Sequence, residues 1–468
     1  METKRPFWKK FIGDRAFYGT VLAVAVPMMV QNAFTQFVSL LDNIMVGRVG
    51  TDQMSGVAIA NQLVFVFSLC IFGALSGVGI FTAQFYGKGD DAGIRRTAKV
   101  KLVLAVVLSV LFAVVFTFWG EPIIRLFLHE GSESGDLAAT LAYGMEYLMW
   151  CRWLLLPFAL VQVYASTLRE TAVTKPPMVA GIVAVFVNLA FNYLLIFGKC
   201  GFPALGVSGA AIATIVSRLV EFGLVAGWTH RHSDTNRFAV GLWKPERIPM
   251  PLLRDIAVKG TPLMVNELLW SSGMTILNQC YSTRGLATVA AVNINAVMSQ
   301  LFNVVFMALG SSIGIVVGNL LGANRMKEAR ETDTKMLFFT VASCAVMGTA
   351  MFFFAPLFPK FYNTTDEVRL LAEEMLRITA LIMPFHAFTH GCYFTLRSGG
   401  KTFITFLFDS TWLWAVTVTG AMLIAQKTAM PIIPFFAIIT ASECLKCVVG
   451  YLLVRTDIWM NNIVGETR

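Results

Sequence analysis

The chain has 468 residues, a formal net charge of +9, and a composition that is 56% hydrophobic and 14% charged. Soluble globular domains carry about 25% charged residues, so this composition excludes an ordinary soluble protein. Apolar runs of about 18 or more residues recur along the whole chain. Such runs indicate helices, because the strands of an outer-membrane barrel would show alternating polarity. We therefore expect an all-α integral membrane protein that crosses the lipid bilayer many times.

The hydrophobic segments predict about twelve transmembrane helices. In chain order they cover residues 16–46, 54–84, 96–119, 138–166, 176–198, 206–229, 254–282, 287–319, 335–358, 368–395, 402–426 and 431–455. Residues 230–253 between the sixth and seventh segments are polar and contain prolines, which is typical of a linker. The predicted domains are an N-lobe at 1–229, a cytoplasmic linker at 230–253 and a C-lobe at 254–468.

The positive charge lies mainly on one side of the predicted membrane. About 26 of the Lys and Arg residues fall in the termini and one set of alternate loops, and about seven fall in the opposite set. The positive-inside rule then predicts that both termini are cytoplasmic, in a protein of the cytoplasmic (plasma) membrane. Because the basic residues lie in the termini and loops on one side of the predicted membrane, the positive-inside rule explains the net charge, and we expect no nucleic-acid partner.

The two halves of the chain repeat each other. Pro27 and Pro262 lie 235 residues apart, and the same offset relates GVGIFTAQFYGKG at 77–89 to SIGIVVGNLLGAN at 312–324. The sequence TLR likewise ends at both Arg169 and Arg397. Matching hydropathy and loop charge predict two parallel six-helix lobes, an architecture that is typical of secondary transporters working by alternating access.

One carboxylate, Asp42, interrupts the first hydrophobic segment. A charge at bilayer depth costs roughly 2.5–3.5 kcal/mol on the most lenient insertion scale, so such a residue is a functional-site hypothesis. Asn188 and Asn192 lie at i, i+4 on one helix face, and Thr214 adds a hydroxyl from the sixth segment. Together these hard oxygens suit Na⁺, and the carboxylate could instead carry a proton. One alternative is that Asp42 lies at the end of its helix and meets lipid headgroups or water. Another is that the Asn and Thr side chains only join helices. Beyond this Na⁺ site, no metal site is predicted.

Two further pairs of charges lie within predicted helices. Arg218 and Glu221 are three residues apart in the sixth segment, and Glu443 and Lys446 repeat the spacing in reverse order in the twelfth. At this spacing each pair can neutralise itself along its own helix. We expect them to be structural charge pairs, and gating contacts are the alternative role.

Four residues of the second half are candidates for the lining of a substrate cavity. Glu267 and Trp270 lie on one face of the seventh segment, and an acid beside an aromatic ring suits a lipophilic cation. His386 and His390 lie at i, i+4 in the tenth segment, without the Glu of a zinc-binding H-E-x-x-H motif. Helix packing is the alternative role for Glu267, and a proton relay is an alternative role for the two histidines.

The sequence contains no phosphate-binding G-x-x-x-x-G-K-[ST] motif and no soluble segment large enough for an ATPase. Transport energy would therefore come from an ion gradient. We expect no enzymatic activity, no cofactor and no ATPase subunit, and we expect a monomer.

The motifs resemble the multidrug and toxic compound extrusion (MATE) family of transporters, of prokaryotic type, along essentially the whole chain. They are Pro27, LLDNIMVGRVG at 40–50, AQFYGKGD at 83–90, N-x-x-x-N-Y-L-L-I-F-G at 188–198, GAAIAT at 209–214, and the repeated TLR. The resemblance implies two six-helix lobes around a central V-shaped cavity. It also implies export of small organic cations or amphipathic drugs and metabolites in exchange for Na⁺ or H⁺.

By this resemblance, Asp42, Asn188, Asn192 and Thr214 match the cation or proton site of the N-lobe. Some prokaryotic members have a second acid where this chain has Asn192. The acid that family members carry in the seventh helix corresponds to Trp270, with Glu267 one turn earlier, and His386 replaces an acid of the tenth helix. These departures leave the coupling ion open.

Two other functions fit parts of the sequence. A flippase for lipid-linked precursors shares the bilobed design, but it would need a basic cavity, and Arg218 and Lys446 are almost the only basic residues near the midplane. A gated channel is a second alternative. The internal repeat favours alternating access over a channel.

Overall fold

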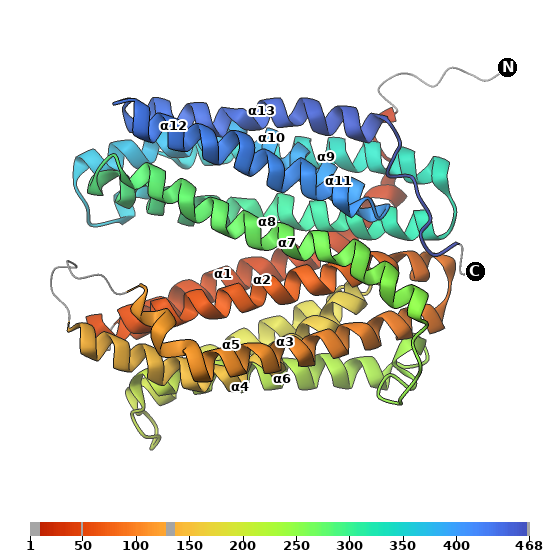
Figure 1. Ribbon diagram of the computed structural model, residues 1–468, viewed down its shortest axis with the longest axis horizontal. Coiled ribbons are helices and arrows are strands. Elements are labelled where there is room, and N and C mark those ends of the chain that lie inside the picture. Colours follow the sequence, from red (N-terminus) through yellow and green to blue (C-terminus); the bar gives the residue numbers. More distant parts are fainter. Residues whose placement is uncertain (1–9, 48–49, 128–135, 466–468) are drawn as a thin grey trace. The chain divides into compact units, whose positions relative to one another are not determined.

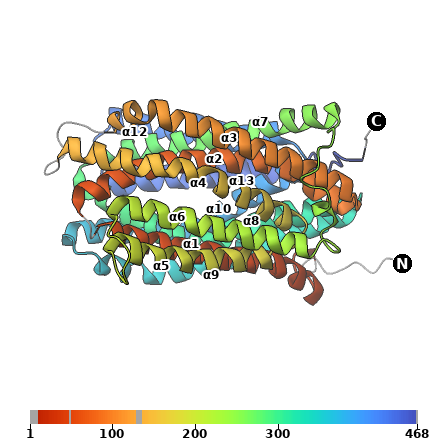
Figure 2. The same cartoon turned by 90° about the horizontal axis from the view of Figure 1, so that it is seen from below.

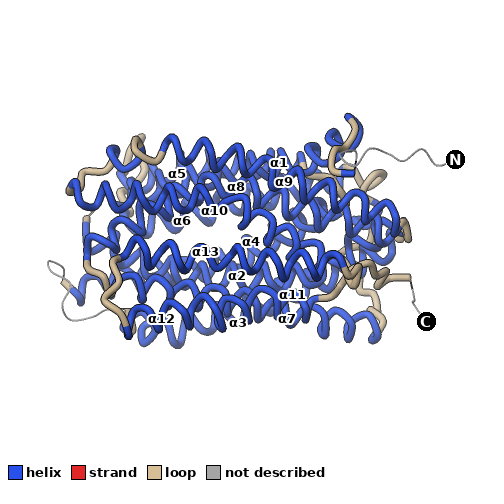
Figure 3. The backbone as a smooth tube through the Cα atoms, turned by 90° about the horizontal axis from the view of Figure 1, so that it is seen from above, coloured by secondary structure: helices blue, strands red, loops and turns tan. Residues whose placement is uncertain are grey.

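The computed structural model describes residues 10–47, 50–127 and 136–465, apart from the side chains at 39, 40, 42–44, 46, 47 and 51. Within these residues the chain forms helices and loops only (Figure 3). The first half contains α1 (Arg15–Gly47), α2 (Thr51–Lys88), α3 (Asp91–Arg125), α4 (Leu137–Glu170), α5 (Lys175–Phe197), α6 (Gly206–Arg231) and the short η2 (Arg237–Ala239). The second half contains α7 (Met250–Ser282), α8 (Leu286–Gly322), α9 (Met326–Phe354), η3 (Phe358–Phe361), α10 (Asp366–Ser398), α11 (Thr402–Phe406), η4 (Leu407–Thr411), η5 (Leu413–Val418), α12 (Thr419–Lys427) and α13 (Ile432–Arg455).

The predicted fold class is confirmed. The elements from α11 to α12 follow one another as a single span, Thr402–Lys427, so the described residues contain the twelve long helices that the hydrophobic segments predict. Ten of these helices are long and apolar enough to cross a membrane. The other two, α7 and α10, are long enough but not apolar enough. Both are less apolar because they carry more polar and charged side chains.

Several helix ends follow from local sequence signals. The Asp90 and Asp136 carboxylates accept hydrogen bonds from the first free backbone N–H groups of α3 and α4, and the Thr365 hydroxyl does the same for α10. Gly198 ends α5 with a φ of +63°, a backbone conformation that residues with a Cβ rarely adopt. The helix ends lie within about six residues of the expected ones except in α9, which begins nine residues before the segment expected at 335–358.

The described residues form two compact units. The C-terminal unit combines the residues up to Met29, Ala83–Gly89 and the residues from Ala257 on, and the N-terminal unit combines Val30–Thr82 with Asp90–Ile256. These units depart from the lobes predicted at 1–229 and 254–468, because the first part of α1 and the last turns of α2 pack with the second half. The lobe division, which rests on the sequence repeat, stays a prediction.

In the N-terminal unit, α4 packs against both α3 and α6, and α5 packs against α6 (Figures 1 and 2). The α5–α6 contact is close at Gly209, where an added Cβ would lie 2.6 Å from the carbonyl oxygen of Leu195. The small residues that open α6 therefore allow the helices to approach. This contact brings the polar faces of α5 and α6 together.

In the C-terminal unit, α10 is central and packs against α8, α9 and α13. The core of this unit includes Ile313, Met336, Leu396 and Trp459, all 1% exposed or less. Val21 and Ala25 of α1 belong to the same buried cluster. The first part of α1 is thus part of this unit's core.

The last turn of α2 crosses the last turns of α8 at repeat-related positions. A Cβ added to Gly87 would lie 1.8 Å from the carbonyl oxygen of Asn319, and one added to Gly322 would lie 1.9 Å from that of Gln84. Gly87 and Gly322 are 235 residues apart, as are Gln84 and Asn319. The glycine of each repeat therefore contacts the backbone of the other repeat. Real Cβ atoms do not approach this closely, so both positions require glycine.

The C-terminal segment is hydrogen-bonded to the same crossing. The fully buried Gln84 donates to the carbonyl oxygens of Ser398 and Asn461 and accepts from the backbone N–H of Ile463. The Lys88 ammonium donates to the carbonyl oxygen of Val464 at 2.8 Å. Residues 461–464 are therefore fixed against the end of α2.

One carboxylate of the linker pairs with three basic residues of α3. Glu246 accepts hydrogen bonds from Lys99 at 2.7 Å, Arg95 at 3.2 Å and Arg96 at 3.1 Å. Hydrogen bonding to Lys99, then to Arg95 and Arg96, lowers the pKa of Glu246 to about 2. Glu246 is thus ionised at neutral pH and holds the linker to the basic first turns of α3.

Candidate functional site

Three of the four residues predicted to bind the coupling cation meet in the N-terminal unit. The Asn192 amide of α5 donates to the Asn188 side-chain oxygen at 3.1 Å, and the Asn188 amide donates to the Thr214 hydroxyl of α6 at 3.3 Å. Both Asn side chains are buried, and Thr214 is half-buried. A chain of amide and hydroxyl groups therefore lies between two largely apolar helices.

The side chain of the fourth residue, Asp42, lies outside the described residues, although its backbone belongs to α1. Contacts earlier in α1 show which way α1 runs along α5. An added Cβ at Gly181 would lie 2.6 Å from the Gln31 amide nitrogen, and the rings of Phe34 and Phe186 lie 6.4 Å apart. From the first contact to the second, the residue numbers increase along both helices, so α1 and α5 are parallel.

The first predicted charge pair forms as the sequence indicates. The Arg218 guanidinium donates to the Glu221 carboxylate at 2.6 Å, and the Glu221 side chain is only 3% exposed. Arg218 also lies over the ring of Phe158, 5.6 Å from its centre. The pair is thus largely enclosed within the N-terminal unit.

The second predicted pair is corrected by the structure. Lys446 donates instead to Asp409 at 2.8 Å, from α13 to the neighbouring helical span. Glu443 accepts from the Thr389 hydroxyl of α10 at 3.1 Å. Spacing along one helix does not reveal partners on the helices packed against it, and those partners decide which ions pair here.

Asp409 is the centre of a polar network that joins three helices. Its second oxygen accepts from the Asn266 amide of α7 at 3.0 Å, and the Ser410 hydroxyl donates to the Asn266 side-chain oxygen at 2.6 Å. Asn266 and Ser410 are 2% and 1% exposed. The charges of Asp409 and Lys446 are therefore compensated inside the unit.

Glu267 of α7 lies next to this network. Its carboxylate accepts from the Tyr393 hydroxyl of α10 at 3.5 Å, a long contact, and the Glu267 side chain is half-buried. Trp270, predicted to share its face, is 41% exposed. The Trp414 indole N–H instead donates to the carbonyl oxygen of Leu269 at 3.0 Å, which fixes α7 against the span that carries Asp409.

The two predicted histidines lie in different surroundings. The His386 Nδ1 is 3.8 Å from a Glu443 carboxylate oxygen, and its side chain is 40% exposed. His390 is enclosed by the rings of Phe306, Tyr393 and Phe394, with ring centres 5.0–6.1 Å away. The His390 Nε2 finds no hydrogen-bond partner among the described residues. The two histidines therefore do not form one cluster, although both lie on α10.

Sequence reasoning missed most of the C-terminal network. Asp409 carries the same signal as Asp42, an acid within a hydrophobic segment, but the sequence alone does not decide its role. Asp409 and Ser410 also lie in the π-helical turn η4, which is followed by a second one, η5. Such turns are common at functional sites, but hydrophobic periodicity alone does not predict them.

The donors in both units suit small cations better than transition metals. Among the described residues, no three His, Cys, Asp or Glu side chains lie close enough to hold a metal ion. Amide, hydroxyl and carboxylate oxygens are hard ligands for ions such as Na⁺, and the carboxylates of the C-terminal unit can also carry protons.

Comparison with known proteins identifies one family. The MatE family model matches residues 27–194 and 262–408, which together make up more than half of the chain. The two matched stretches begin at the repeat-related Pro27 and Pro262. The family match therefore covers both predicted lobes.

Individual relatives agree with this match. The chain is 27% identical over 333 residues to a probable multidrug resistance protein NorM of Rhizobium meliloti (strain 1021), covering 70% of this chain and 68% of that protein. It is 25% identical over 365 residues to the multidrug resistance protein MdtK of Yersinia pestis (strain Pestoides F), covering 77% and 78%. A solved outward-facing structure of a multidrug resistance MATE family transporter of the MOP superfamily superposes with a TM-score of 0.85 at 18% identity, covering 98% of this chain and 99% of that one.

Proposed function

Because the chain belongs to the MatE family, we propose that this multi-pass membrane transporter exports cationic or amphipathic compounds by antiport. The coupling ion is Na⁺ or H⁺, which moves into the cell down its gradient as substrate leaves. Both termini lie in the cytoplasm, and the protein resides in the cytoplasmic membrane. The cluster of Asn188, Asn192 and Thr214 is the observation that carries this proposal, because it joins polar groups between apolar helices.

Helix geometry supports the assignment of Asp42 to this cluster. Gln31 of α1 and Gly181 of α5 lie side by side. Asp42 follows Gln31 by eleven residues in α1, and Asn192 follows Gly181 by eleven residues in α5. At 1.5 Å per residue, both helices advance about 16 Å over that length. Since they run in parallel, Asp42 and Asn192 reach the same depth. Asn192 cannot titrate, so Asp42 is the group that exchanges the ion.

Substituting Asp42 with Asn should reduce export to the background of cells without the protein, while the amount in the membrane stays unchanged. The substitution keeps the shape of the side chain but removes the charge that binds a cation or a proton. Drug resistance and dye efflux in whole cells measure the effect. Asp52→Asn, in the first turn of α2, is the matched control and should export normally; normal export by Asp42→Asn would refute the coupling role.

Alternating access of the two predicted lobes is the proposed transport step. The crossing of α2 and α8 supports it, because repeat-related residues meet there in equivalent ways. The flippase alternative is weaker, since Arg218 and Lys446 are each paired with a carboxylate and do not form a free basic surface. A channel would need no such pairing of repeats.

Glu267 is proposed to attract the positive charge of a substrate. Substituting it with Gln should raise the half-saturating concentration of a cationic dye by roughly tenfold, equivalent to ~1.4 kcal/mol, and leave a neutral substrate unaffected. Transport into inverted vesicles at several dye concentrations measures this shift. Glu374→Gln, at an exposed position of α10, is the control. Equal shifts for the cationic and the neutral compound would remove Glu267 from the substrate site.

A further inference from the structure

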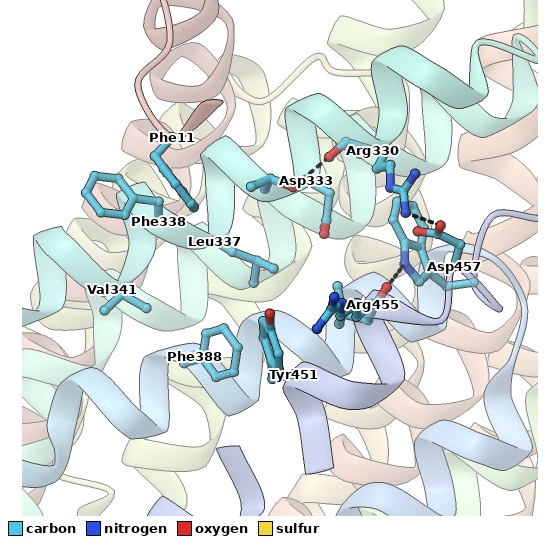
Figure 4. A pocket seen from close by; sticks show the side chains of 13 residues that line it. Phe11, Arg330, Asp333, Leu337, Phe338, Val341, Phe388, Tyr451, Arg455 and Asp457 are labelled. Atoms are coloured by element: carbon cyan, nitrogen blue, oxygen red, sulfur yellow. Dashed lines mark hydrogen bonds and ion pairs between the residues drawn. The ribbon is translucent and has the colours of Figure 1, made fainter. Parts of the chain in front are cut away.

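A groove on the C-terminal unit lies apart from both polar clusters. Helices α9 and α13 both pack on α10, and a cavity of about 390 Å³ opens between them (Figure 4). Its apolar wall consists mainly of Phe11, Leu337, Phe338, Val341, Phe388 and Tyr451. Phe338 is 46% exposed and Tyr451 is 53% exposed, so the groove faces outward from the unit.

The groove has a cationic end. Arg330, one turn into α9, and Arg455, the last residue of α13, both line it there. Asp457 also lines the groove and forms an ion pair with Arg330, which compensates the charge of that arginine. The exposed Arg455 has no ion-pair partner in the described part of the chain, so it supplies the positive charge of this end. Asp333 also lines the groove, but it is 1% exposed and accepts a hydrogen bond from the Thr395 hydroxyl at 2.5 Å.

The side chains in Figure 4 show how the two ends differ. The Arg455 guanidinium extends from the last turn of α13 towards Tyr451, one turn earlier, whereas Phe338 and Val341 lie towards the other end. From Arg330 to Val341 the groove follows eleven residues of α9, or about 16 Å. That length is about half of the ~30 Å hydrocarbon core, which is the depth of one leaflet.

We propose that this groove binds an anionic phospholipid of the cytoplasmic leaflet. The lipid phosphate pairs with Arg455 and approaches Arg330, and an acyl chain lies along Phe338, Val341 and Phe388. Length, apolar wall and cationic end together fit such a lipid, since basic pockets between membrane helices on the cytoplasmic side bind anionic headgroups. The inference rests on the proposed orientation of the chain and not on its export activity.

Native mass spectrometry of the purified full chain, titrated with phosphatidylglycerol or phosphatidylcholine, tests the site. We expect the protein to retain one phosphatidylglycerol in preference to phosphatidylcholine. Arg455→Gln should weaken this binding by about tenfold because it removes the unpaired cation. Val341→Trp should abolish it by filling the groove, and Lys327→Gln, an exposed α9 cation outside the groove, should leave it unchanged.

The controls separate this site from other sources of binding. Glycerophosphoglycerol, the headgroup without acyl chains, should not displace the lipid; effective competition would show a site for a soluble phosphate instead. Equal retention of both lipids, or unchanged binding by both Arg455→Gln and Val341→Trp, would overturn the proposal. Dye export by the same variants distinguishes this result from a failure of the proposed transport function.

Discussion

Substituting Lys446 with Met should destabilise the protein by about 3–5 kcal/mol, because it leaves the Asp409 charge without its ion partner. The Lys446 side chain is 9% exposed and the Asp409 side chain 20%, so water cannot fully replace the lost contact. The Asn266 amide remains as a donor to Asp409, but it carries no charge. Thermal unfolding of the purified protein in detergent measures the loss.

The double substitution Asp409→Asn with Lys446→Met should recover most of that stability. Removing both charges together avoids the cost of an unpaired ion, so the two effects should be strongly non-additive. Lys427→Met, at the exposed end of α12, should unfold like the wild type. Additive losses in the double variant would show that Lys446 and Asp409 act independently.

Substituting either Gly87 or Gly322 with Ala should impair both stability and export. A Cβ at either position would lie within 2 Å of a backbone carbonyl oxygen, so the crossing helices must separate. Forcing extra atoms into a packed contact typically costs about 1–3 kcal/mol. Separation would also strain the three hydrogen bonds of Gln84 to residues 398, 461 and 463.

Gly227→Ala is the control for this crossing. An added Cβ at Gly227 in α6 meets no atom within 4 Å, and alanine is the better helix former by about 1 kcal/mol. This variant should therefore unfold no earlier than the wild type and export normally. If Gly87→Ala and Gly322→Ala also behave like the wild type, the close crossing has no role in the transport cycle.

Much of the fold could be predicted because the helices are long and strongly apolar. Each hydrophobic segment corresponds to one helical span, and the repeat-related Pro27 and Pro262 lie inside α1 and α7. The i, i+4 spacing of Asn188 and Asn192 also correctly predicted side chains on one helix face. Periodicity within a helix determines which of its residues lie side by side.

Contacts between helices could not be predicted in the same way. Lys446 and Glu443 are neighbours along α13, yet the partner of Lys446 is Asp409 on another span. The packing of the first part of α1 and the last turns of α2 with the second half likewise depends on tertiary contacts. Sequence reasoning therefore located polar residues in apolar helices but not their partners.

Purified protein in liposomes loaded with a cationic fluorescent dye tests whether a cation gradient drives export. A Na⁺ gradient or a pH gradient is imposed separately, and each is then collapsed with an ionophore. We expect one of the two gradients to drive dye against its concentration gradient, and we expect Asp42→Asn to abolish this movement. If dye movement is independent of both gradients, or if the protein shows a steady single-channel conductance, it is not a cation-coupled antiporter.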